Sequence, residues 1–542
     1  MENTSAPEIR SGAGAGAVTN ASAPETRAGA GAGAGTVTNA SAPGIRPEVG
    51  AMRNTAEHIG VGDAGGSRSV VSRDQSLYID GAWVEGAGSR PVRDRWTGER
   101  IGTVAEGRGE HAVRAVDAAE RAMARGLPVP ERARVLATAA RLVEERGEEF
   151  ARSITAETGK PITAARGEVG RAVQTLGWAA EETRRLTGET VPLDAVESGA
   201  GTIALTVPEA RGIAAAVTPF NFPLNLVLHK VAPALAAGCA VVLKPSDKAV
   251  LVAGLLVEVF AEAGLPAGWL NLVTGTPADV VEPWIDDPRV AVISFTGSSR
   301  VGWDLKARSP RKLHVLELGS NTAMVVTGNA DLERAAADAV TSALANSGQA
   351  CVSLQRVYVT RGVADRFVTL LGEAFGAVRY GDPRDDATVV GPLVTTEATE
   401  GLKRSIDAAV AGGARLLAGG EVVGGVLEPT LLAEVDPDSA LVCEEAFGPV
   451  ASVLVVDDLD EAIRGVNSSA YALNSSIYTG DLGEAMEYAA RAQAGSVLVN
   501  MPPSYRADHM PYGGVKDSGQ GTEGVRYAVH ELLHHKLVVL KP

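Results

Sequence analysis

Short apolar runs alternate with longer amphipathic stretches between residues 212 and 316. The apolar runs cover residues 213–217, 239–243, 269–273 and 290–295, and the stretches with helical spacing cover residues 223–237, 249–263 and 277–285. Short apolar runs bounded by turn residues are typical of strands buried on both faces. The alternation predicts a parallel sheet flanked by helices, which binds ligands at the carboxyl ends of its strands. A second series of the same kind covers residues 322–500.

The flanking segments have other patterns. LYIDGAWVEG alternates apolar and polar residues around an Asp-Gly pair and predicts a small hairpin. Amphipathic stretches at residues 111–125, 130–158 and 162–187 predict helices, with a Gly stop and a Pro restart at 159–161. Residues 199–216 predict one exposed and one buried strand, and the last residues predict a short helix and an apolar strand, KLVVL, that needs a partner edge.

Residues 1–75 have a different composition, rich in Gly, Ala, Ser and Thr, with a repeated SAP motif. Such a segment has too little bulky apolar surface to offset chain entropy, so we expect it to be disordered. Two alternatives explain this segment. The true start codon lies further downstream, or the segment is a tail that docks on a partner.

The composition narrows the class of protein. A chain of 542 residues with a net charge of −16 is long enough for two or three domains and is too acidic to bind nucleic acid or anionic membranes as its main activity. Three cysteines are too few for a disulfide framework, which favours a cytoplasmic location. We see no secretory signal and no apolar run of the ~18 residues that a membrane span requires.

Three loops follow strands of the first series, where ligands are expected. VTPFNFP places Asn221 in a turn between two prolines, or else Asn221 bonds its own backbone. LKPSD carries Lys244, Ser246 and Asp247, which suit ribose hydroxyls, although Ser246 or Asp247 can also cap a helix. FTGSSRVG begins a helix whose N–H groups can hold a pyrophosphate, but its glycines do not match the Gly-x-Gly-x-x-Gly spacing.

The stretch from Leu316 to Cys351 opens LELGSN and closes SGQAC. Glu317 ends an apolar run and Cys351 stands in a Gly-Gln setting, so the two are candidates for a base and a nucleophile on separate elements. A lone cysteine is more often a small buried hydrophobe, and for Cys239 and Cys443 we expect only that.

The tail contains His530-Glu531-Leu532-Leu533-His534, the spacing of zinc proteases. Few residues follow it to supply a third ligand, so we expect a surface helix and no metal site.

Seven separated motifs, taken together, resemble those of the aldehyde dehydrogenase superfamily. They are TPFNFP, LKPSD, FTGSSRVG, LELGSN, SGQAC, EEAFGPV and MPYGGVKDSG. The resemblance implies an α/β fold with two parallel-sheet domains and a small bridging β element. Residues 76–198 and 212–316 would form the NAD(P)-binding domain, residues 317–505 the catalytic domain, and residues 199–211 and 527–542 the element that makes homodimers or homotetramers.

The resemblance also implies a mechanism. Cys351 is the nucleophile that forms a thiohemiacetal, and Asn221 and the Cys351 backbone N–H hold its oxyanion. Glu317 activates the water that hydrolyses the later thioester, and Lys230 assists near this centre. The expected activity is oxidation of a small polar aldehyde to its carboxylate, with hydride transfer to NAD(P).

Cofactor contacts follow from the same resemblance. Lys244 and Asp247 are expected at the adenosine ribose, Gly297, Ser298 and Gly302 near the pyrophosphate, Glu445 and Phe447 on the nicotinamide side, and Thr218, Phe220, Ser246 and Leu318 as further contacts. A carboxylate such as Asp247 binds ribose hydroxyls and repels a 2′-phosphate, so NAD is favoured and NADP is possible.

The substrate expectation comes from the tail. SYRADHMPYGGVKDSG resembles the branch of lactaldehyde, non-phosphorylating glyceraldehyde-phosphate and phosphonoacetaldehyde dehydrogenases. Arg506 then pairs with an anionic or hydroxylated substrate, or else it makes a loop salt bridge. Ala350 argues against a phosphorylated substrate, because relatives that handle phosphate often carry arginine there.

Other activities stay open. The CoA-acylating semialdehyde dehydrogenases typically lack the carboxylate that Glu317 provides, so hydrolysis is favoured over transfer to CoA. The further alternatives are a non-catalytic dinucleotide-binding homologue and a thiol-dependent esterase.

Overall fold

The computed structural model describes residues 72–542. The predicted tail lies almost wholly outside these residues, and its predicted end at residue 75 is too late. Arg73–Gln75 form β1, which pairs in parallel with β5 (Arg100–Glu106). Gln75 is buried and Arg73 pairs with Glu258, so contacts with distant parts of the chain hold this strand in place.

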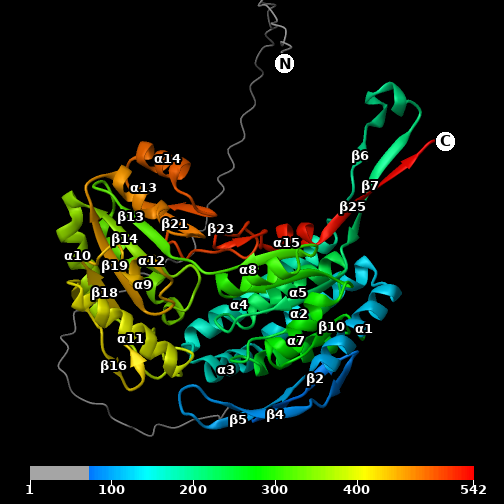
Figure 1. Ribbon diagram of the computed structural model, residues 1–542, viewed down its shortest axis with the longest axis horizontal. Helices are drawn as coiled ribbons and strands as arrows, with labels where there is room; N and C mark the ends of the chain where they lie inside the picture. The colour runs from blue at the N-terminus through cyan, green and yellow to red at the C-terminus, as the bar shows by residue number, and fades with distance from the viewer. Residues whose placement is uncertain (1–71) are drawn as a thin grey trace, which may run out of the picture. The chain divides into compact units, whose positions relative to one another are not determined.

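An eight-stranded sheet forms the first α/β region (Figure 1). Its strand order is β24-β12-β11-β8-β9-β10-β2-β3, and the strands from β12 to β10 run parallel. The bounds are β2 (Leu77–Ile79), β3 (Ala82–Val84), β8 (Ile213–Val217), β9 (Val241–Lys244), β10 (Leu270–Leu272), β11 (Val290–Thr296), β12 (Leu313–Glu317) and β24 (Gly519–Gln520). The predicted parallel sheet and the predicted β2–β3 hairpin are both present.

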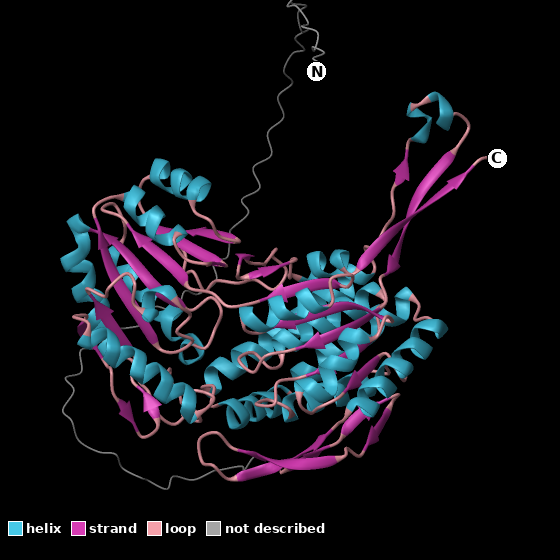
Figure 2. Cartoon of the chain, viewed as in Figure 1, coloured by secondary structure: helices cyan, strands magenta, loops and turns pink. Residues whose placement is uncertain are grey.

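Helices cover both faces of this sheet (Figure 2). They are α1 (Gly109–Arg125), α2 (Val129–Glu145), α3 (Gly147–Thr158), α4 (Ile162–Thr183), α5 (Asn225–Ala237), α6 (Leu251–Glu262), α7 (Pro277–Asp286) and α8 (Ser299–Arg308). Their apolar faces and the strands form one buried cluster. Each large aliphatic side chain buried there contributes roughly 1.5–3 kcal/mol. Among residues 72–542, no helix is long and apolar enough to span a membrane.

The predicted helix over residues 130–158 is two helices. The chain breaks between α2 and α3 at Arg146, whose φ and ψ are −97° and 17°. Gly147 follows and is a poor helix former, while the Arg146 guanidinium binds Glu149 and Glu258. These ion pairs hold the junction in a bend.

The strand order reverses at β8. The chain passes from β8 to β9 and β10 on one side, and then returns to β11 and β12 on the other side. The loops after β8 and β11 therefore leave the sheet toward opposite faces. Sheets of this kind bind ligands in the crevice between two such loops. The register pairs Phe295 with Val217 and Thr296 with Glu317, so Thr218, Thr296 and Glu317 lie at one edge.

A second, seven-stranded sheet begins only a few residues after the first sheet ends. Its order is β15-β18-β19-β14-β13-β21-β22, parallel except for β15. The strands are β13 (Thr322–Val326), β14 (Leu354–Thr360), β15 (Arg415–Ala418), β18 (Thr430–Ala433), β19 (Val450–Val456), β21 (Asn474–Tyr478) and β22 (Ser496–Val499). The helices are α9 (Leu332–Leu344), α10 (Arg361–Gly376), α11 (Thr396–Ala411), α12 (Ala440–Cys443), α13 (Leu459–Asn467) and α14 (Leu482–Arg491).

The tail returns to the first sheet. β24 pairs antiparallel with β12, which places residues 505–523 against the carboxyl end of β12, and no sequence pattern indicated this pairing. α15 (Val525–Glu531) then packs on α5 and α4. Small elements complete the fold: β4 (Gly88–Arg93), β16 (Val422–Val423), β17 (Val426–Leu427), β20 (Tyr471–Ala472) and β23 (Val515–Lys516).

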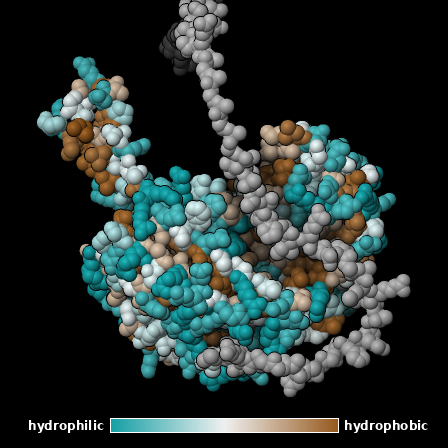
Figure 3. All heavy atoms as spheres, turned by 180° about the vertical axis from the view of Figure 1, so that it is seen from behind, coloured by the Kyte–Doolittle hydropathy of each residue, from teal (hydrophilic) through white to brown (hydrophobic). Residues whose placement is uncertain are grey.

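A three-stranded antiparallel sheet projects beyond the helices around the first sheet (Figure 1). It contains β6 (Thr190–Val191), β7 (Ile203–Ala210) and β25 (Leu533–Leu540). β25 pairs with β7 from Leu533 opposite Ala210 to Leu540 opposite Ile203, so the tail strand has the partner that the sequence required. The projecting sheet carries apolar surface (Figure 3).

Candidate active site

Asn346 joins two loops that come from different sheets. Asn221 lies in the loop after β8, and Cys351 lies in the loop before β14. The Asn346 Nδ2 group donates to the carbonyl oxygen of Asn221 at 3.0 Å and to that of Gln349 at 3.1 Å. The two loops are therefore fixed against each other beside Cys351.

The turn before Cys351 has a left-handed backbone over three consecutive residues. Asn346, Ser347 and Gly348 have φ values of 52°, 56° and 72°. A Cβ atom at position 348 would lie 1.9 Å from the carbonyl oxygen of Gly448, so only glycine fits there. Left-handed non-glycine residues cost about 1–3 kcal/mol each, and such strain concentrates at functional sites.

Four side chains act on the Cys351 thiol. The Tyr512 hydroxyl lies 3.1 Å from the Cys351 Sγ. Burial raises the pKa of the thiol to about 11, and the charges of Glu317 and Glu445 act in the same direction. The Tyr512 hydrogen bond and the Arg506 charge lower this pKa. The predicted base and the predicted nucleophile thus belong to one site.

Glu317 is a buried carboxyl group without partners. It is 3% exposed, and neither of its oxygens has a hydrogen-bond partner among residues 72–542. Burial, and next the charge of Glu523, raise its pKa well above the ordinary value, against the smaller influence of Arg506 and Lys230. A carboxyl group in this state is a candidate proton acceptor.

Glu523 is a second buried carboxyl group, and two cations hold it. The Lys230 Nζ atom donates to one oxygen and the Arg506 guanidinium donates to the other, each at 3.0 Å. The Arg506 guanidinium also stacks over the Tyr512 ring, 3.7 Å from its centroid. The salt bridge considered for Arg506 is therefore present, and it lies inside the site rather than on a surface loop.

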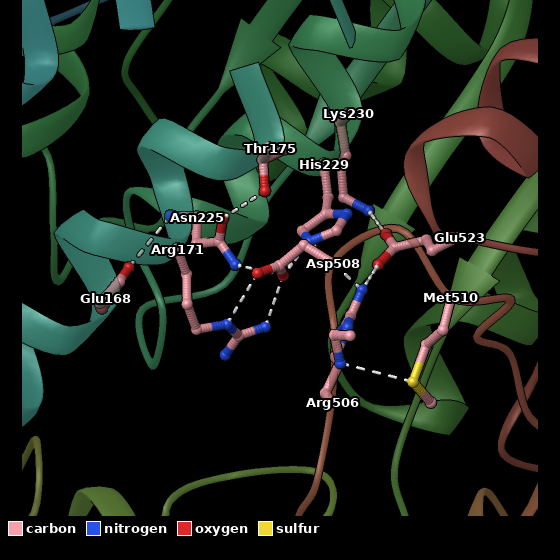
Figure 4. A network of polar contacts seen from close by, with 11 residues as sticks. Glu168, Arg171, Thr175, Asn225, His229, Lys230, Arg506, Asp508, Met510 and Glu523 are labelled. Atoms are coloured by element: carbon pink, nitrogen blue, oxygen red, sulfur yellow. Dashed lines mark hydrogen bonds and ion pairs between the residues drawn. The ribbon is translucent and has the colours of Figure 1, made fainter. Parts of the chain in front are cut away.

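A third acidic group, Asp508, organises the neighbouring polar network (Figure 4). It accepts from two of the three Arg171 guanidinium nitrogens at 2.7 and 3.1 Å and from the Asn225 amide at 3.0 Å, and it lies 2.8 Å from the His229 Nε2 atom. His229 and Arg171 lower its pKa far below the ordinary value. The Arg506 guanidinium lies 3.5 Å from the same His229 atom, so the networks of Asp508 and Glu523 are continuous.

Asn221 is buried and has a free donor group. Its Oδ1 atom accepts from the N–H of the next residue, Phe222, at 3.2 Å, whereas the Asx bond considered for a turn asparagine runs to the backbone two residues on. Its Nδ2 group has no hydrogen-bond partner among residues 72–542. The side chain can therefore donate to an oxygen that arrives with a ligand.

Two buried hydroxyl groups at the reversal of the strand order also lack partners. They are the Oγ1 atoms of Thr218, directly after β8, and of Thr296, at the end of β11. Buried hydroxyls are normally hydrogen-bonded, so these positions fit the polar edge of a bound dinucleotide. The residues at this edge are thus compatible with NAD(P).

The loop after β9 contains a charged cluster. The Lys244 Nζ atom donates to Asp247 at 3.2 Å, and an Arg90 nitrogen lies 3.9 Å from the same carboxylate. Neither Ser246 nor Asp247 caps α6, and that alternative is wrong. Glu157 caps α6 instead, since its oxygens accept from the N–H groups of residues 250–252 at 2.7–2.9 Å.

The remaining predicted cofactor residues surround the start of α8. Ser298 is the N-cap of α8 but its side chain makes no cap bond, and a Cβ atom at Gly302 would lie 2.3 Å from the Leu318 side chain. The Gly297 N–H donates to the Glu317 carbonyl oxygen at 3.1 Å. Across this loop, Glu445 accepts from the Ser320 N–H at 2.9 Å, and the rings of Phe220 and Phe447 meet edge to face.

Comparison with known proteins identifies the class. Residues 83–538 match the family described as "Aldehyde dehydrogenase family". The chain belongs to this family. It is an NAD(P)-dependent dehydrogenase that oxidises a small aldehyde to the acid.

Similar proteins give finer resemblances. The dehydrogenase is 38% identical over 468 residues to the 3-sulfolactaldehyde dehydrogenase of Priestia megaterium, with 86% of this chain and 98% of that protein covered. It matches lactaldehyde dehydrogenase from Escherichia coli with a TM-score of 0.83 and 35% identity, covering 86% and 99% of the chains. It matches NADP-dependent glyceraldehyde-3-phosphate dehydrogenase from Bacillus halodurans C-125, complexed with NADP, with a TM-score of 0.84 and 33% identity, covering 86% and 99%. Solved relatives are described as NAD-dependent and as NADP-dependent.

Sequence reasoning missed three polar residues of this dehydrogenase, namely Tyr512, Glu523 and Asp508. Tyr512 stands inside MPYGGVKDSG, and Asp508 and Glu523 flank that motif. The motif was a signal that the segment matters, but its contacts depend on the pairing of β24 with β12.

Three smaller expectations have different outcomes. Cys239 is buried as expected, whereas Cys443 is exposed, so the expectation for Cys443 is wrong. The expectation that residues 530–534 form one surface helix is wrong, because α15 ends at Glu531 and His534 belongs to strand β25. The His530 Nε2 atom lies 3.5 Å from Glu182, and the His534 Nε2 atom lies 3.2 Å from Glu209.

Proposed function

We propose that this dehydrogenase oxidises a small polar aldehyde through a thioester on Cys351, which is hydrolysed by water that Glu317 activates. One observation carries the proposal. The Cys351 thiol contacts the Tyr512 hydroxyl at 3.1 Å, and the buried, unpartnered Glu317 carboxyl lies beside the next residue, Gly513, where a Cβ atom would be 3.6 Å from the Glu317 Oε1 atom. Covalent catalysis followed by hydrolysis requires this pair of groups.

In the first step, the Cys351 thiolate attacks the carbonyl carbon, a C–S bond forms, and the carbonyl π pair moves to oxygen. The free Nδ2 group of Asn221 and the backbone N–H of Cys351 are the proposed donors to this oxyanion. Donors aimed at a developing charge away from bulk water typically contribute about 3–4 kcal/mol each. The hydrogen bond from Asn346 fixes the backbone of Asn221 for this task.

NAD(P) bound along the loops after β8, β9 and β11 supplies the hydride acceptor. Thr218, Lys244, Asp247, Gly297, Ser298, Glu445 and Phe447 are the residues proposed to hold it, with Phe220, Ser246, Gly302 and Leu318 beside them. Gly302 and Leu318 pack on one another, so we propose that they hold the backbone around the start of α8 in place and do not bind the cofactor directly.

In the last step, Glu317 takes a proton from water, the water oxygen bonds to the thioester carbon, and the Cys351 sulfur leaves as the thiolate. A free carboxylate suits this role, because an ion pair would lower its basicity. Lys230 is proposed to act on this step indirectly, since its ammonium is held by Glu523 and its charge lowers the pKa of Glu317.

The proposed substrate carries an anionic or hydroxylated group next to the aldehyde. The Arg506 Nε and His229 Nδ1 atoms are buried without partners among residues 72–542. The Arg506 Nε–H can donate to an oxygen of a ligand, and His229, whose Nε2 faces Asp508, can accept from a ligand hydroxyl through Nδ1. Similarity to 3-sulfolactaldehyde dehydrogenase favours a sulfonate, and Ala350 argues against a phosphate. Arg506 is the proposed contact for this group.

We propose NAD as the preferred cofactor, with NADP usable. The Asp247 carboxylate repels a 2′-phosphate, but Lys244 and Arg90 both lie near its Oδ1 atom and reduce that repulsion. Asp247→Asn should raise kcat/KM with NADP relative to NAD by about tenfold, which is about 1.4 kcal/mol.

We propose a homodimer or homotetramer built through the β6-β7-β25 sheet. Its exposed apolar side chains include Ile203, Leu537, Val539 and Leu540 (Figure 3). Apolar patches on projecting elements favour association between subunits. Light scattering after size-exclusion chromatography tests this, and Leu537→Asp should lower the measured mass.

The central experiment follows nicotinamide absorbance with sulfolactaldehyde, lactaldehyde, glyceraldehyde phosphate, phosphonoacetaldehyde and succinate semialdehyde, using both cofactors. Cys351→Ala should abolish oxidation of every substrate, and Cys443→Ser, at an exposed thiol, should not. Product analysis with and without CoA separates the hydrolytic reaction from the CoA-acylating alternative. A CoA thioester as the main product would contradict the role of Glu317.

A further inference from the structure

We propose that Tyr512 is a further catalytic residue, whose hydroxyl donates a hydrogen bond to the Cys351 thiolate and holds it ionised before it attacks the aldehyde. This inference rests on the proposed role of Cys351 as the nucleophile. The Tyr512 Oη and Cys351 Sγ atoms are 3.1 Å apart, which is within the range for a hydrogen bond to sulfur. The Tyr512 ring packs in an apolar cluster with Val352, Leu473 and Met510. A phenylalanine ring would fill the same space, so packing alone does not require the hydroxyl.

The direction of this hydrogen bond follows from the protonation of the two groups. Burial, and next the charge of a Cys351 thiolate, raise the pKa of Tyr512 well above the ordinary value. A thiol is ordinarily more acidic than a phenol, so Cys351 loses its proton first and the phenol keeps its own. A protonated phenol beside a thiolate can only donate to it, so Tyr512 stabilises the reactive form of the nucleophile.

Arg506 positions Tyr512 for this role. Its guanidinium stacks 3.7 Å from the centroid of the Tyr512 ring and is anchored by Glu523 at 3.0 Å. Glu523 is anchored in turn by Lys230 on α5. A chain of charged contacts thus leads from helix α5 to the phenol that contacts the Cys351 sulfur.

The other groups around the thiol do not replace Tyr512. Glu317 and Glu445 oppose ionisation of Cys351 because both carry negative charge when ionised. Arg506 favours ionisation, but only through its charge. Among residues 72–542, Tyr512 is the one side chain with a hydrogen bond to the Cys351 sulfur. At neutral pH the Tyr512 hydrogen bond speeds the attack by Cys351 mainly by raising the fraction of thiolate, because the thiol is otherwise mostly protonated.

Tyr512→Phe removes the hydroxyl and keeps the ring. The rate of alkylation by iodoacetamide is measured against pH in the apoenzyme, and the Cys351 peptide is followed by mass spectrometry so that Cys239 and Cys443 do not contribute. The pH midpoint for Cys351 should move upward by about one to two units, because a hydrogen bond to a charged group changes an equilibrium constant roughly tenfold to a hundredfold.

Tyr488→Phe is the matched control. Tyr488 is also buried and also has one hydroxyl hydrogen bond, to Ser475, but it packs in a core cluster of the second sheet that does not contain Cys351. The control should keep the midpoint of the unmodified enzyme. A Tyr512→Phe variant with the unmodified midpoint, and with normal cofactor binding and thermal unfolding, would overturn the proposal.

A kinetic measurement separates this proposal from the proposed function. With an aldehyde that the enzyme turns over, Tyr512→Phe should slow the burst of reduced cofactor about tenfold at pH 7 and restore it at higher pH, with little change in the aldehyde KM. If no aldehyde is oxidised but the alkylation midpoint moves, the proposed function fails and the contact between Tyr512 and Cys351 stands. If aldehydes are oxidised and neither the midpoint nor the burst changes, the role of Tyr512 is wrong and the proposed function stands.

Discussion

Glu317 and Glu523 are two buried carboxyl groups of one site, and their surroundings are opposite. Glu523 has Lys230 and Arg506 at 3.0 Å, and these cations hold its pKa well below the ordinary value. Glu317 has no hydrogen-bond partner among residues 72–542, and its pKa is raised well above the ordinary value by burial and by the charge of Glu523. Both cations act on both carboxyl groups, but they contact only Glu523.

This difference separates a structural role from a reactive one. A buried carboxylate with two ion pairs is held in one protonation state and fixes the groups around it. A carboxyl group without partners can gain or lose a proton during a reaction, which a general base must do. When two neighbouring acids have pKa values shifted in opposite directions, the acid with the raised pKa is the one suited to transfer protons. Here that acid is Glu317.

The same contrast extends to the whole site. Asp508, with partners from α4 and α5, belongs to the network that supports the site (Figure 4). Cys351 and Asn221 have reactive groups with one or no hydrogen-bond partner. Polar groups left free in a buried site cost stability. The networks of Glu523 and Asp508, which lie directly beside them, offset this cost.

Glu317→Gln should have the largest effect on turnover. Steady-state oxidation should fall about a thousandfold, because general base catalysis is lost, while a first burst of reduced cofactor is kept. Measured at a pH below the ordinary carboxyl pKa, the free energy of unfolding should change by less than about 1 kcal/mol, because the amide then replaces a neutral carboxyl group that had no ion pair. Rapid-mixing kinetics and urea unfolding measure the two effects.

A loss of the burst together with turnover would contradict this division. It would mean that Glu317 acts before the thioester forms. A large loss of stability would show that Glu317 has partners in the folded enzyme.

Glu523→Gln should have the opposite balance. Lys230 and Arg506 would keep their charges in a buried place without a counterion, so the free energy of unfolding should fall by about 3–5 kcal/mol. Urea unfolding measures the loss, and Glu421→Gln, at an exposed acid, is the control. A variant as stable as the unmodified enzyme would show that the carboxylate of Glu523 adds no net stability.

The sequence predicted the strands, helices and candidate reactive residues, but it did not predict the different environments of Glu317 and Glu523. The sheet, the hairpin and the order of helices follow from local patterns of a few residues, and Glu317, Cys351 and Asn221 follow from motifs. The partners of these residues are distant in the chain, since Lys230 and Glu523 are 293 residues apart and Cys351 and Tyr512 are 161 apart. No local pattern contains such pairs.

The cap of α6 shows the same limit. Ser246 and Asp247 are adjacent to the helix and fit a local cap, yet Glu157, 93 residues before Val250, takes that place. Local propensity identifies residues that are able to cap, and tertiary packing selects the one that does.

The pH dependence of stability should show both carboxyl groups with opposite signs. The folded pKa of Glu523 is lowered, so its contribution is present above the ordinary carboxyl value and is lost as pH falls below that value toward the lowered pKa. The folded pKa of Glu317 is raised, so its contribution is present below the ordinary value and is lost as pH rises through the raised pKa.

Urea midpoints measured from acid to alkaline pH test both signs. Glu523→Gln should flatten the acid side and Glu317→Gln the alkaline side, each removing a slope of at most about 1.4 kcal/mol per pH unit. If Glu317→Gln flattened the acid side instead, the free carboxyl group would be ionised in the folded enzyme at every pH above its ordinary value.

Arg171→Lys should have the smallest effect, because the network around Asp508 has several members. The substitution keeps one positive charge and removes the two-pronged contact at 2.7 and 3.1 Å, while Asn225 and His229 still contact the same carboxylate. The free energy of unfolding should fall by about 1 kcal/mol, with the burst of reduced cofactor unchanged. A loss of the burst comparable to that of Cys351→Ala would mean that the supporting network and the reactive groups are one unit, and that the difference between Glu317 and Glu523 does not separate two roles.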